Sequence, residues 1–307
     1  MSKRYFFGID GGGTHSRLAL VDGEGNVLAR SDAGSTNIYS VSKEEVYANL
    51  SRLIDSALRS AGLRKEDLAA GCIGSAGMAR EEERRLFRGF VGKLLGEEFP
   101  AKLCSDGEIL LCGGLGSLEG YCLIAGTGSI ALGRSRDGRL ARSGGHGYML
   151  GDEGSASWTG RLAIARLLRS LEGRDLPTDM LEPILEKAGL SQTDDLIRYV
   201  HHDADKAQIA GLAPLVTAAA RNADPLALDI IHTGAKELAL LVKSVLGQSP
   251  WINRKALVLA GGAIQHDEVL AGKLKEILAA EHPALAVSEP KGTALEGACM
   301  LALEIVR

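Results

Sequence analysis

Apolar positions near the start of the chain follow a period of two and are interrupted by glycines. In "YFFGIDGGGTHSRLALVDGEGNVLAR" (5–30), the apolar residues predict strands over 5–10, 17–22 and 27–31. The glycine triplet separates the first two strands, and an Asp-Gly turn separates the last two. The segment therefore predicts a meander of three strands.

The next segment changes to helical spacing. Ser42 and Glu45 form a capping-box pattern at its start, and Gly62 stands where the helix should end. The apolar residues between them fall on one helical face: Val46, Leu50, Leu53, Ile54, Ala57 and Leu58. A strand near 69–77, a helix over 81–95 and a strand over 101–106 follow in the pattern. These elements predict an α/β unit.

The opening pattern then recurs. The stretch "YCLIAGTGSIALGRSRDGRLAR" (121–142) repeats the order of 5–30: tyrosine, apolar strand, glycine-rich turn, alternating strand, Asp-Gly turn and "LAR". Two copies indicate a duplicated domain. We expect a first domain over 1–117 and a second over 118–292 that includes a helical insertion. The final helix, within 293–307, is expected to return to the first domain.

The remaining chain reads as mostly helical. Helix starts are predicted at Ser155, at Thr178, at Ser191 or Thr193, and at Asp224, which precedes a proline. The segment 256–274 then predicts a buried strand, a double glycine and an amphipathic helix.

Three glycine loops, at 11–13, 126–128 and 261–262, each follow an apolar strand. A glycine triplet is costly to order, so it indicates either positive φ angles in a tight hairpin or close approach of bare backbone to a ligand. In a duplicated fold the loops could converge on one cleft, where backbone N–H groups suit a triphosphate. Thr14, Thr127 and Ser129 would add hydroxyl donors. The chain lacks a P-loop motif.

A dinucleotide-binding fold is the alternative for the second loop. Gly126, Gly128 and Ala131 match the spacing of its fingerprint. That fingerprint requires a helix next, whereas "SIALGRS" alternates with period two and favours a strand.

Two carboxylates stand at predicted strand ends. Asp106 closes the strand 101–106 and is interpreted either as a helix N-cap or as a functional carboxylate. Asp10 is either a solvated turn residue or a holder of Mg²⁺ through water. The polar loop "SGGHGYMLGDEGSASW" (143–158) carries His146 and Asp152 and has the density typical of a binding loop.

The charge balance of the chain limits which binding partners are expected. Thirty-five Lys and Arg against 39 Asp and Glu give a net charge of −4, so no basic field favours nucleic acid or anionic lipid. The five cysteines show no C-x-x-C pair and are expected to be buried. We find neither a signal-peptide pattern nor an apolar run of about 18 residues, and expect a cytoplasmic protein without a membrane partner.

The order of "GIDGGGTHS", "STN", "SDG", "AGTGS", "GGHGYMLGDEGSASW", "DADKAQIAGL" and "LAGGAI" resembles the N-acetylglucosamine kinases and the related BadF/BadG/BcrA/BcrD-type ATPases of the actin-like sugar kinase superfamily. The resemblance extends over nearly the whole chain. It implies two ribonuclease H-like domains that close over ATP and an amino sugar, with a homodimer as the common assembly.

The resemblance also implies roles for particular residues. Asp10 would position Mg²⁺, and Asp106 would be the catalytic base. The implied ATP-binding residues are Gly11, Gly12, Gly13, Thr14, Gly126, Thr127, Gly128, Ser129, Ala210, Gly261 and Gly262. The implied sugar-binding residues are Asn37, Ser75, Asp106, Gly145, His146, Gly147 and Asp152.

One departure concerns the sugar. Many N-acetylglucosamine kinases carry tryptophan where this chain has His146, so N-acetylglucosamine, glucosamine, N-acetylmannosamine and N-acetylmuramic acid stay open as substrates. Two other functions stay open as well. One is the ATPase activator of radical dehydratases, which would need cysteines that hold an iron–sulfur cluster. The other is a non-catalytic nucleotide-binding protein.

Overall fold

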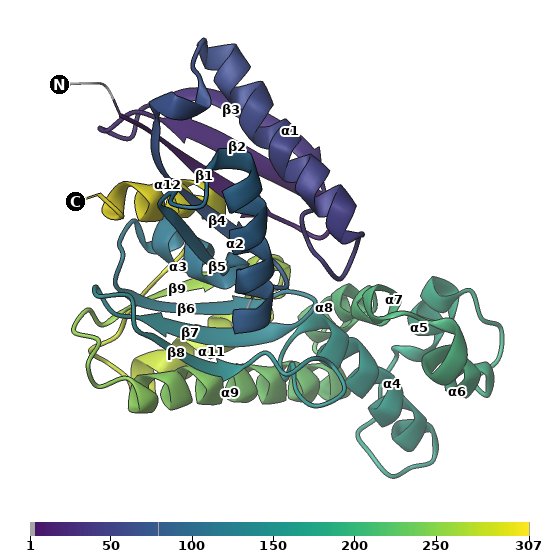
Figure 1. The fold of residues 1–307 in the computed structure, drawn as a ribbon. Coiled ribbons are helices and arrows are strands. Elements are labelled where there is room, and N and C mark those ends of the chain that lie inside the picture. The colour runs from purple at the N-terminus through teal and green to yellow at the C-terminus, as the bar shows by residue number, and fades with distance from the viewer. Residues whose placement is uncertain (1–3, 79, 307) are drawn as a thin grey trace. The chain divides into compact units, whose positions relative to one another are not determined.

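The computed structural model describes residues 4–78 and 80–306. The chain divides into two compact units. Unit 1 comprises the described residues within Met1–Gly120, Arg134–Arg139 and Pro290–Arg307, and unit 2 comprises Tyr121–Gly133 and Leu140–Glu289. Figure 1 shows the path of the chain.

A five-stranded mixed sheet forms the centre of unit 1. Its strands are β1 (Tyr5–Gly11), β2 (His15–Val21), β3 (Val27–Gly34), β4 (Leu68–Ser75) and β5 (Ala101–Ser105), in the order β3-β2-β1-β4-β5. The first three strands pair antiparallel, which confirms the meander, whereas β4 and β5 join in parallel. The carboxyl ends of β1, β4 and β5 therefore share one edge of the sheet.

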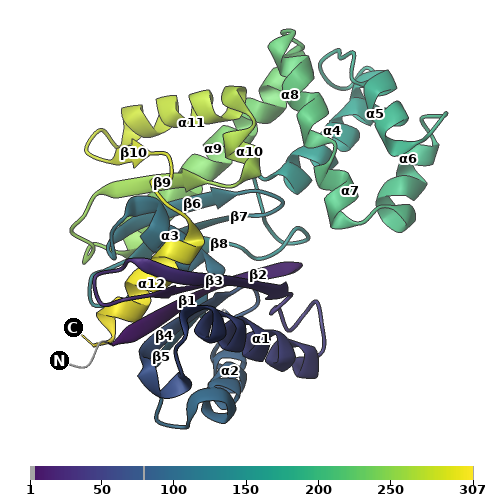
Figure 2. The ribbon, with the colours of Figure 1, turned by 90° about the horizontal axis from the view of Figure 1, so that it is seen from above.

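Helices cover both faces of this sheet. They are α1 (Lys43–Ala61), the short η1 (Lys65–Asp67), α2 (Glu81–Leu95), α3 (Asp106–Leu115) and α12 (Ala294–Glu304). Figure 2 shows α1 and α2 on one face and α3 and α12 on the other. The predicted caps of α1 are confirmed, since the Ser42 hydroxyl accepts from the Glu45 N–H and Gly62 ends the helix at φ 67°.

The α12 helix packs against β1 and α3 through glycines. A Cβ on Gly297 would lie 1.9 Å from the Ile109 carbonyl oxygen, and one on Gly113 would lie 1.8 Å from the Thr293 carbonyl oxygen. On β1, a Cβ on Gly8 would lie 2.5 Å from the Cys299 nitrogen. Backbone contact this close leaves no room for any larger residue at the three positions.

Unit 2 repeats the sheet of unit 1. Its strands are β6 (Gly120–Ala125), β7 (Ser129–Arg134), β8 (Leu140–Gly144), β9 (Ala256–Ala260) and β10 (Ala286–Ser288). Their order, β10-β9-β6-β7-β8, matches that of unit 1 when each strand is compared with its counterpart. The β9 strand pairs in parallel with both β6 and β10. The predicted duplication is thus confirmed, and so is a strand rather than a helix after "AGTGS".

The helices of unit 2 include an extension between β8 and β9. They are α4 (Ala156–Leu171), α5 (Leu181–Ala188), α6 (Asp195–Arg198), η2 (Tyr199–Asp203), α7 (Lys206–Ala210), α8 (Ala213–Arg221), α9 (Pro225–Gln248), α10 (Gly262–Gln265) and α11 (Glu268–Glu281). Figure 1 shows α5 and α6 farther from the sheet of this unit than α9 and α11.

The helix starts of unit 2 test the sequence predictions. Ser155 caps α4, and Asp224 caps α9 with Pro225 in the first turn, as predicted. The start predicted at Thr178 is wrong, because α5 begins after Met180. The Thr178 hydroxyl instead donates to the Asp224 carboxylate, 2.8 Å away, and so builds the turn before the helix.

Each unit has its own apolar core. One cluster gathers residues of β1, β2, α1 and α2, and the other gathers residues of β6, β9, α4, α8, α9 and α11. All five cysteines are buried, as expected. Burial raises the pKa of the Cys112 thiol to about 12 and that of the Cys299 thiol to about 11. Across residues 4–78 and 80–306, no helix combines the length and apolar character needed to cross a bilayer.

Candidate functional site

The carboxyl edge of the unit 1 sheet collects several of the predicted site residues. In the parallel register Gly11 lies opposite Ser75, and Ser75 lies opposite Ser105. Asp10 and Asp106 are the chain neighbours of Gly11 and Ser105. Ligands of open α/β sheets bind beyond such carboxyl ends, so this edge is a candidate site.

The glycine triplet at this edge is packed mainly by the protein itself. The triplet lies at the turn of the antiparallel β1–β2 hairpin, but none of Gly11, Gly12 and Gly13 has a positive φ, so the explanation by positive φ angles is wrong. A Cβ on Gly11 would lie 2.3 Å from the Thr36 hydroxyl oxygen, and one on Gly12 would lie 2.6 Å from the His15 carbonyl oxygen. Gly13 differs, because its Cβ would come no closer than 3.5 Å to any described residue. It is the exposed position of the triplet.

Asn37 and Ser75 lie beside this loop. The Asn37 side-chain oxygen accepts from the Tyr39 N–H at 2.9 Å, and its amide nitrogen would lie 3.8 Å from a Cβ on Gly13. The Asn37 amide is therefore oriented by the turn, with its nitrogen toward the glycine loop. The buried Ser75 hydroxyl donates to the Thr36 carbonyl. Ser75 therefore lies next to the glycine loop, but its hydroxyl hydrogen is used in a hydrogen bond within the protein.

Asp106 is not the N-cap of the helix that follows. Ser105 is the cap, because its hydroxyl accepts from the Glu108 N–H at 3.3 Å, and Asp106 is the first residue of α3. The cap interpretation of Asp106 is therefore wrong, since serine and aspartate are both good caps and the sequence does not choose between neighbours. The Asp106 carboxylate accepts from the adjacent Gly107 N–H at 2.9 Å.

The environment of Asp106 favours its protonated form. Partial burial raises the pKa of its carboxyl group, and the charge of Asp10 adds to the rise, while the Gly107 N–H opposes it. Asp10 itself accepts from the Arg17 guanidinium at 2.7 Å across the β1–β2 pair. Two carboxylates thus share one edge, and only one of them has this arginine partner.

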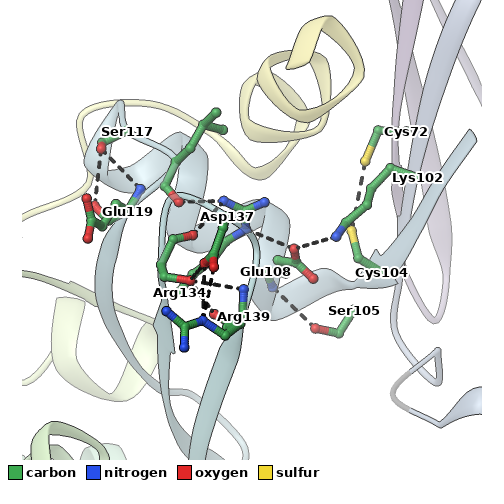
Figure 3. Close-up of polar contacts among 12 residues, drawn as sticks. Cys72, Lys102, Cys104, Ser105, Glu108, Ser117, Glu119, Arg134, Asp137 and Arg139 are labelled. Carbon is green, nitrogen blue, oxygen red and sulfur yellow. Dashed lines mark hydrogen bonds and ion pairs between the residues drawn. The ribbon is translucent and has the colours of Figure 1, made fainter. Parts of the chain in front are cut away.

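Buried charges fix the first turn of α3. The Glu108 carboxylate is almost fully buried and accepts from the Arg134 guanidinium at 3.0 Å, and the Lys102 ammonium lies 3.2 Å away. Arg134 also donates to the Leu118 carbonyl. Figure 3 shows these side chains around the start of α3. Breaking a buried pair of this kind costs about 3–5 kcal/mol, so the group holds the turn that carries Asp106.

The carboxyl edge of the unit 2 sheet borders a cavity of about 440 Å³. Four residues with an implied ATP role line it: Gly126, Thr127, Ala210 and Gly262. The β6 and β9 strands pair in parallel up to Ile124 and Ala260, which brings both glycine loops to the same end of the sheet. The other lining residues come from α4, α8, α11 and the segments before them: Ala156, Thr159, Ala213, Pro214, Thr217, Arg221, Ala263, His266, Asp267 and Leu270.

The glycines at this cavity have free space. A Cβ on Gly126 would have the Gly262 nitrogen, 3.9 Å away, as its nearest described neighbour, and one on Gly262 would lie 3.6 Å from the His266 ring. Packing within the protein therefore does not explain why either position lacks a side chain. Gly261 differs, because it has φ 96° and its Cβ would lie 2.4 Å from the Ala125 carbonyl oxygen.

Ser129 and Asp152 interact with each other rather than with the cavity. The Ser129 N–H donates to the Asp152 carboxylate at 3.2 Å, and its hydroxyl donates to the Glu153 carbonyl at 2.8 Å. A Cβ on Gly128 would lie 2.8 Å from the same carboxylate. Asp152 is buried and also accepts from the Lys206 ammonium at 2.8 Å. These contacts hold the loop 126–129 in place on the side that faces Asp152.

The polar loop before Asp152 depends on glycines with left-handed backbone. Gly145 has φ 69° and Gly147 has φ 86°. The Gly145 N–H donates to the Ser129 carbonyl at 2.9 Å, which ties this loop to β7. His146 is exposed between the two glycines. The structure thus groups Gly145, His146, Gly147 and Asp152 within unit 2.

Sequence reasoning missed several residues of the cavity wall. Asp267 caps α11 and accepts from the Thr217 hydroxyl at 2.7 Å, and Arg221 pairs with Glu268. His266 and Asp267 follow "AGGAIQ" directly, so their proximity to the third glycine loop was a usable signal. Thr217 gave no such signal, because α8 reaches the cavity only in three dimensions.

The matching sheets and their glycine loops define the class of protein. Two sheets of one order, each followed by helices, constitute a duplicated ribonuclease H-like fold of the actin-like ATPase type. The sequence pattern of the BadF/BadG/BcrA/BcrD ATPase family matches residues 7–302. The chain belongs to this family.

Characterised relatives are similar over nearly the whole chain. An N-acetylmuramic acid/N-acetylglucosamine kinase of Clostridium acetobutylicum is 35% identical over 97% of this chain and 98% of its own. An N-acetyl-D-glucosamine kinase of Dictyostelium discoideum is 30% identical over 99% of each chain. A structural-genomics crystal structure from Chromobacterium violaceum, provisionally named an N-acetylglucosamine kinase, matches with 27% identity and a TM-score of 0.73, over 98% of this chain and 99% of that one.

Proposed function

We propose that the protein is an ATP-dependent amino-sugar kinase and that N-acetylglucosamine is phosphorylated on its 6-hydroxyl. The observation that carries the proposal is the unit 2 cavity, where Gly126 and Gly262 are bare although the protein leaves space at both. The family and the names of the relatives support the same activity.

The nucleotide belongs in the unit 2 cavity. Its volume of about 440 Å³ is within the range typical of small-molecule sites. The Gly126 N–H donates to the Gly128 carbonyl at 2.9 Å, so we assign the phosphate oxygens to the N–H groups of Thr127 and Gly128 and to the Thr127 hydroxyl. Charge-assisted hydrogen bonds of this type contribute about 1.5–3 kcal/mol each. Ala210 and Gly262 present a smooth apolar wall to the adenosine. Ser129 supports the loop, because its own donors serve Asp152 and Glu153.

In this proposal Asn37 and Asp106 of unit 1 bind the sugar. Asp106 accepts the proton of the attacking hydroxyl as that oxygen bonds to the γ-phosphorus. The bond from the γ-phosphorus to the β–γ bridging oxygen breaks, and ADP leaves. A positioned general base contributes typically 10²–10⁴-fold. Asp106 suits this role, because Ser105 caps α3 and the Asp106 carboxylate is not needed as the cap.

Magnesium fits the acidic edge of unit 1. Mg²⁺ in kinases is held by one or two carboxylates together with waters and substrate phosphates. Asp10 supplies one carboxylate at a strand end, and it is partly exposed. When bound, the ion would neutralise charge on the phosphates during transfer. Arg17 donates to Asp10 at 2.7 Å and orients this carboxylate.

The alternatives differ in what they need from the chain. An activator of radical dehydratases needs accessible cysteines, and all five cysteines here are buried. Glucosamine and N-acetylmuramic acid kinases use the same machinery, so only the sugar distinguishes them. His146 is exposed where tryptophan is usual and is the residue we expect to influence that choice. A cytoplasmic homodimer is part of the proposal, and light scattering on the purified protein tests the dimer.

A substrate panel tests the activity. The purified protein is incubated with ATP, Mg²⁺ and each of N-acetylglucosamine, glucosamine, N-acetylmannosamine and N-acetylmuramic acid, and ADP and phosphorylated sugar are measured by mass spectrometry. We expect sugar-dependent ADP release and a 6-phosphate product with N-acetylglucosamine. ADP release that no sugar accelerates would contradict the proposal and favour a nucleotide-binding protein without kinase activity.

A further inference from the structure

A buried carboxylate lies directly beneath the proposed phosphate loop. Asp152 is 3% exposed, accepts from the Ser129 N–H, and would lie 2.8 Å from a Cβ on Gly128. A negative charge in that position is unfavourable for a polyanionic ligand on the other side of the loop. A buried carboxylate without a counter-charge is also costly in itself. The loop therefore requires a cation.

Lys206 supplies that cation from a distant part of the sequence. Its ammonium group lies 2.8 Å from the second oxygen of Asp152, across a separation of 54 residues. The same ammonium lies 5.8 Å from the centre of the Tyr148 ring, on the loop that precedes Asp152. One lysine thus contacts Asp152 and Tyr148, and through Asp152 it acts on the loop 126–129.

The helix that carries Lys206 also forms part of the cavity. Lys206 is the first residue of α7 and Ala210 is its last, one turn away, and Ala210 lines the cavity together with Gly126 and Thr127. The helix is fixed in place, because Asp205 and Gln208 form a capping box and a Cβ on Gly160 of α4 would lie 2.0 Å from the Ile209 carbonyl oxygen. The lysine is therefore held on a rigid wall of the site.

We propose that Lys206 is a positioning residue for nucleotide binding: it neutralises Asp152 beneath the loop 126–129 and holds that loop in its binding shape. The proposal rests on the proposed ATP-binding function of unit 2. Lys206 acts through Asp152 and needs no contact with the nucleotide. Its effect is electrostatic, so it must depend on the charge of its partner.

A pair of variants separates this role from others. Binding of ADP is measured by isothermal titration calorimetry without sugar, so that a role of Asp152 in sugar binding does not interfere. Lys206→Met leaves the buried carboxylate without its ammonium partner, and we expect ADP affinity to fall about 10- to 100-fold. The double variant Lys206→Met, Asp152→Asn removes both charges. We expect it to recover most of the lost affinity.

Two further variants serve as controls. Lys206→Arg keeps the positive charge and should bind ADP within about threefold of the parent protein. Lys236→Met removes an exposed lysine on α9 outside the cavity and should not change the affinity. Should Lys206→Met not fold, as judged by circular dichroism, Lys206→Gln replaces it. Its amide still donates to Asp152 but leaves the charge uncompensated.

Each outcome decides between the explanations. Unchanged ADP affinity in Lys206→Met, or in Lys206→Gln in its place, would overturn the inference and leave the proposed function intact. A loss that Asp152→Asn does not rescue would overturn it too, and would indicate direct contact of Lys206 with phosphate. Failure of the parent protein to bind ADP would overturn the proposed function itself. Weaker binding with rescue supports the inference.

Discussion

The carboxyl edges of the two sheets have the same strand order and different surroundings. In unit 1 the Thr36 hydroxyl and the His15 carbonyl lie where Cβ atoms on Gly11 and Gly12 would be, and two aspartates stand beside the loop. In unit 2 Gly126 and Gly262 have space around them and border a cavity.

Glycine therefore occurs at the carboxyl edge of the two sheets for two different reasons. The unit 1 glycines accommodate the protein's own atoms, so their loss should affect folding. Gly126 and Gly262 of unit 2 have open space around them, so their loss should affect binding. Under the proposed function, the two copies of one scaffold have different roles: unit 1 supplies the general base and unit 2 binds the nucleotide.

The largest effect is expected from Asp106 in unit 1. Asp106→Asn should lower kcat by about 10²–10⁴-fold, because the amide cannot accept the proton of the sugar hydroxyl. Steady-state kinetics with ATP and the best sugar of the panel measure it. The pKa of Asp106 in the folded protein is raised, so its ionised form costs folding free energy at neutral pH. The variant should therefore show no fall in Tm.

Turnover at the parental rate in Asp106→Asn would exclude Asp106 as the base. Ser105→Ala is the matched control. It removes the cap of α3, which is worth about 1 kcal/mol, and should lower Tm while kcat changes far less than in Asp106→Asn.

Gly126→Ala tests the open space in unit 2. The added methyl group meets no described atom closer than 3.9 Å, so the Tm without nucleotide should stay within about 2 °C of the parent. In the cavity the methyl group would occupy space that the proposal assigns to the nucleotide, and ADP affinity should fall about tenfold or more. Calorimetry with ADP and a thermal melt without ligand give the two values. Equal ADP affinity would show that this glycine does not approach the nucleotide.

Gly11→Ala is the reciprocal test in unit 1. Its methyl group would lie 2.3 Å from the Thr36 oxygen and 2.8 Å from the Ser75 hydroxyl oxygen, both of which are buried. Overpacking of this kind costs about 1–3 kcal/mol. Urea unfolding measures the loss. Gly13→Ala, at the open end of the same triplet, should unfold close to the parent midpoint, and a loss equal to that of Gly11→Ala would contradict the assignment.

The smallest effect concerns pH. Burial, with a contribution from Asp10, holds the pKa of Asp106 above the ordinary 3.8, so the ionised base is lost on acidification at a higher pH than for an ordinary aspartate. The acid limb of kcat/KM for the sugar should have its midpoint above that value. The variant Asp106→Asn should lose this acid limb of the pH profile. A midpoint at or below 3.8 would contradict the environment described for Asp106.

Much of the fold followed from the sequence, because local patterns determine it. The α2 helix begins and ends where its apolar periodicity predicts, and Asp224 before Pro225 marks the start of α9. The Thr178 start failed, because the Thr178 hydroxyl donates to Asp224, 46 residues away. A contact of that separation leaves no local signal.

The site was less predictable than the fold. The glycine loops could be located, but not which glycines are packed by the protein and which are open. The sequence also could not show that Asp152 pairs with Lys206, or that Arg134 from β7 buries Glu108 beside the proposed base. These pairs depend on how distant segments meet. Neighbouring cap formers, as at Ser105 and Asp106, are a second source of error.

The last helix has a consequence for synthesis. Gly8 on β1 and Gly113 on α3 fit closely against the backbone of α12, which leaves the ribosome after the described elements of both units that precede it. One face of the first sheet consequently has α3 but lacks α12 while the second unit is being made. The order in which the halves mature is thus the reverse of the order in which they begin: the amino-terminal unit is completed last.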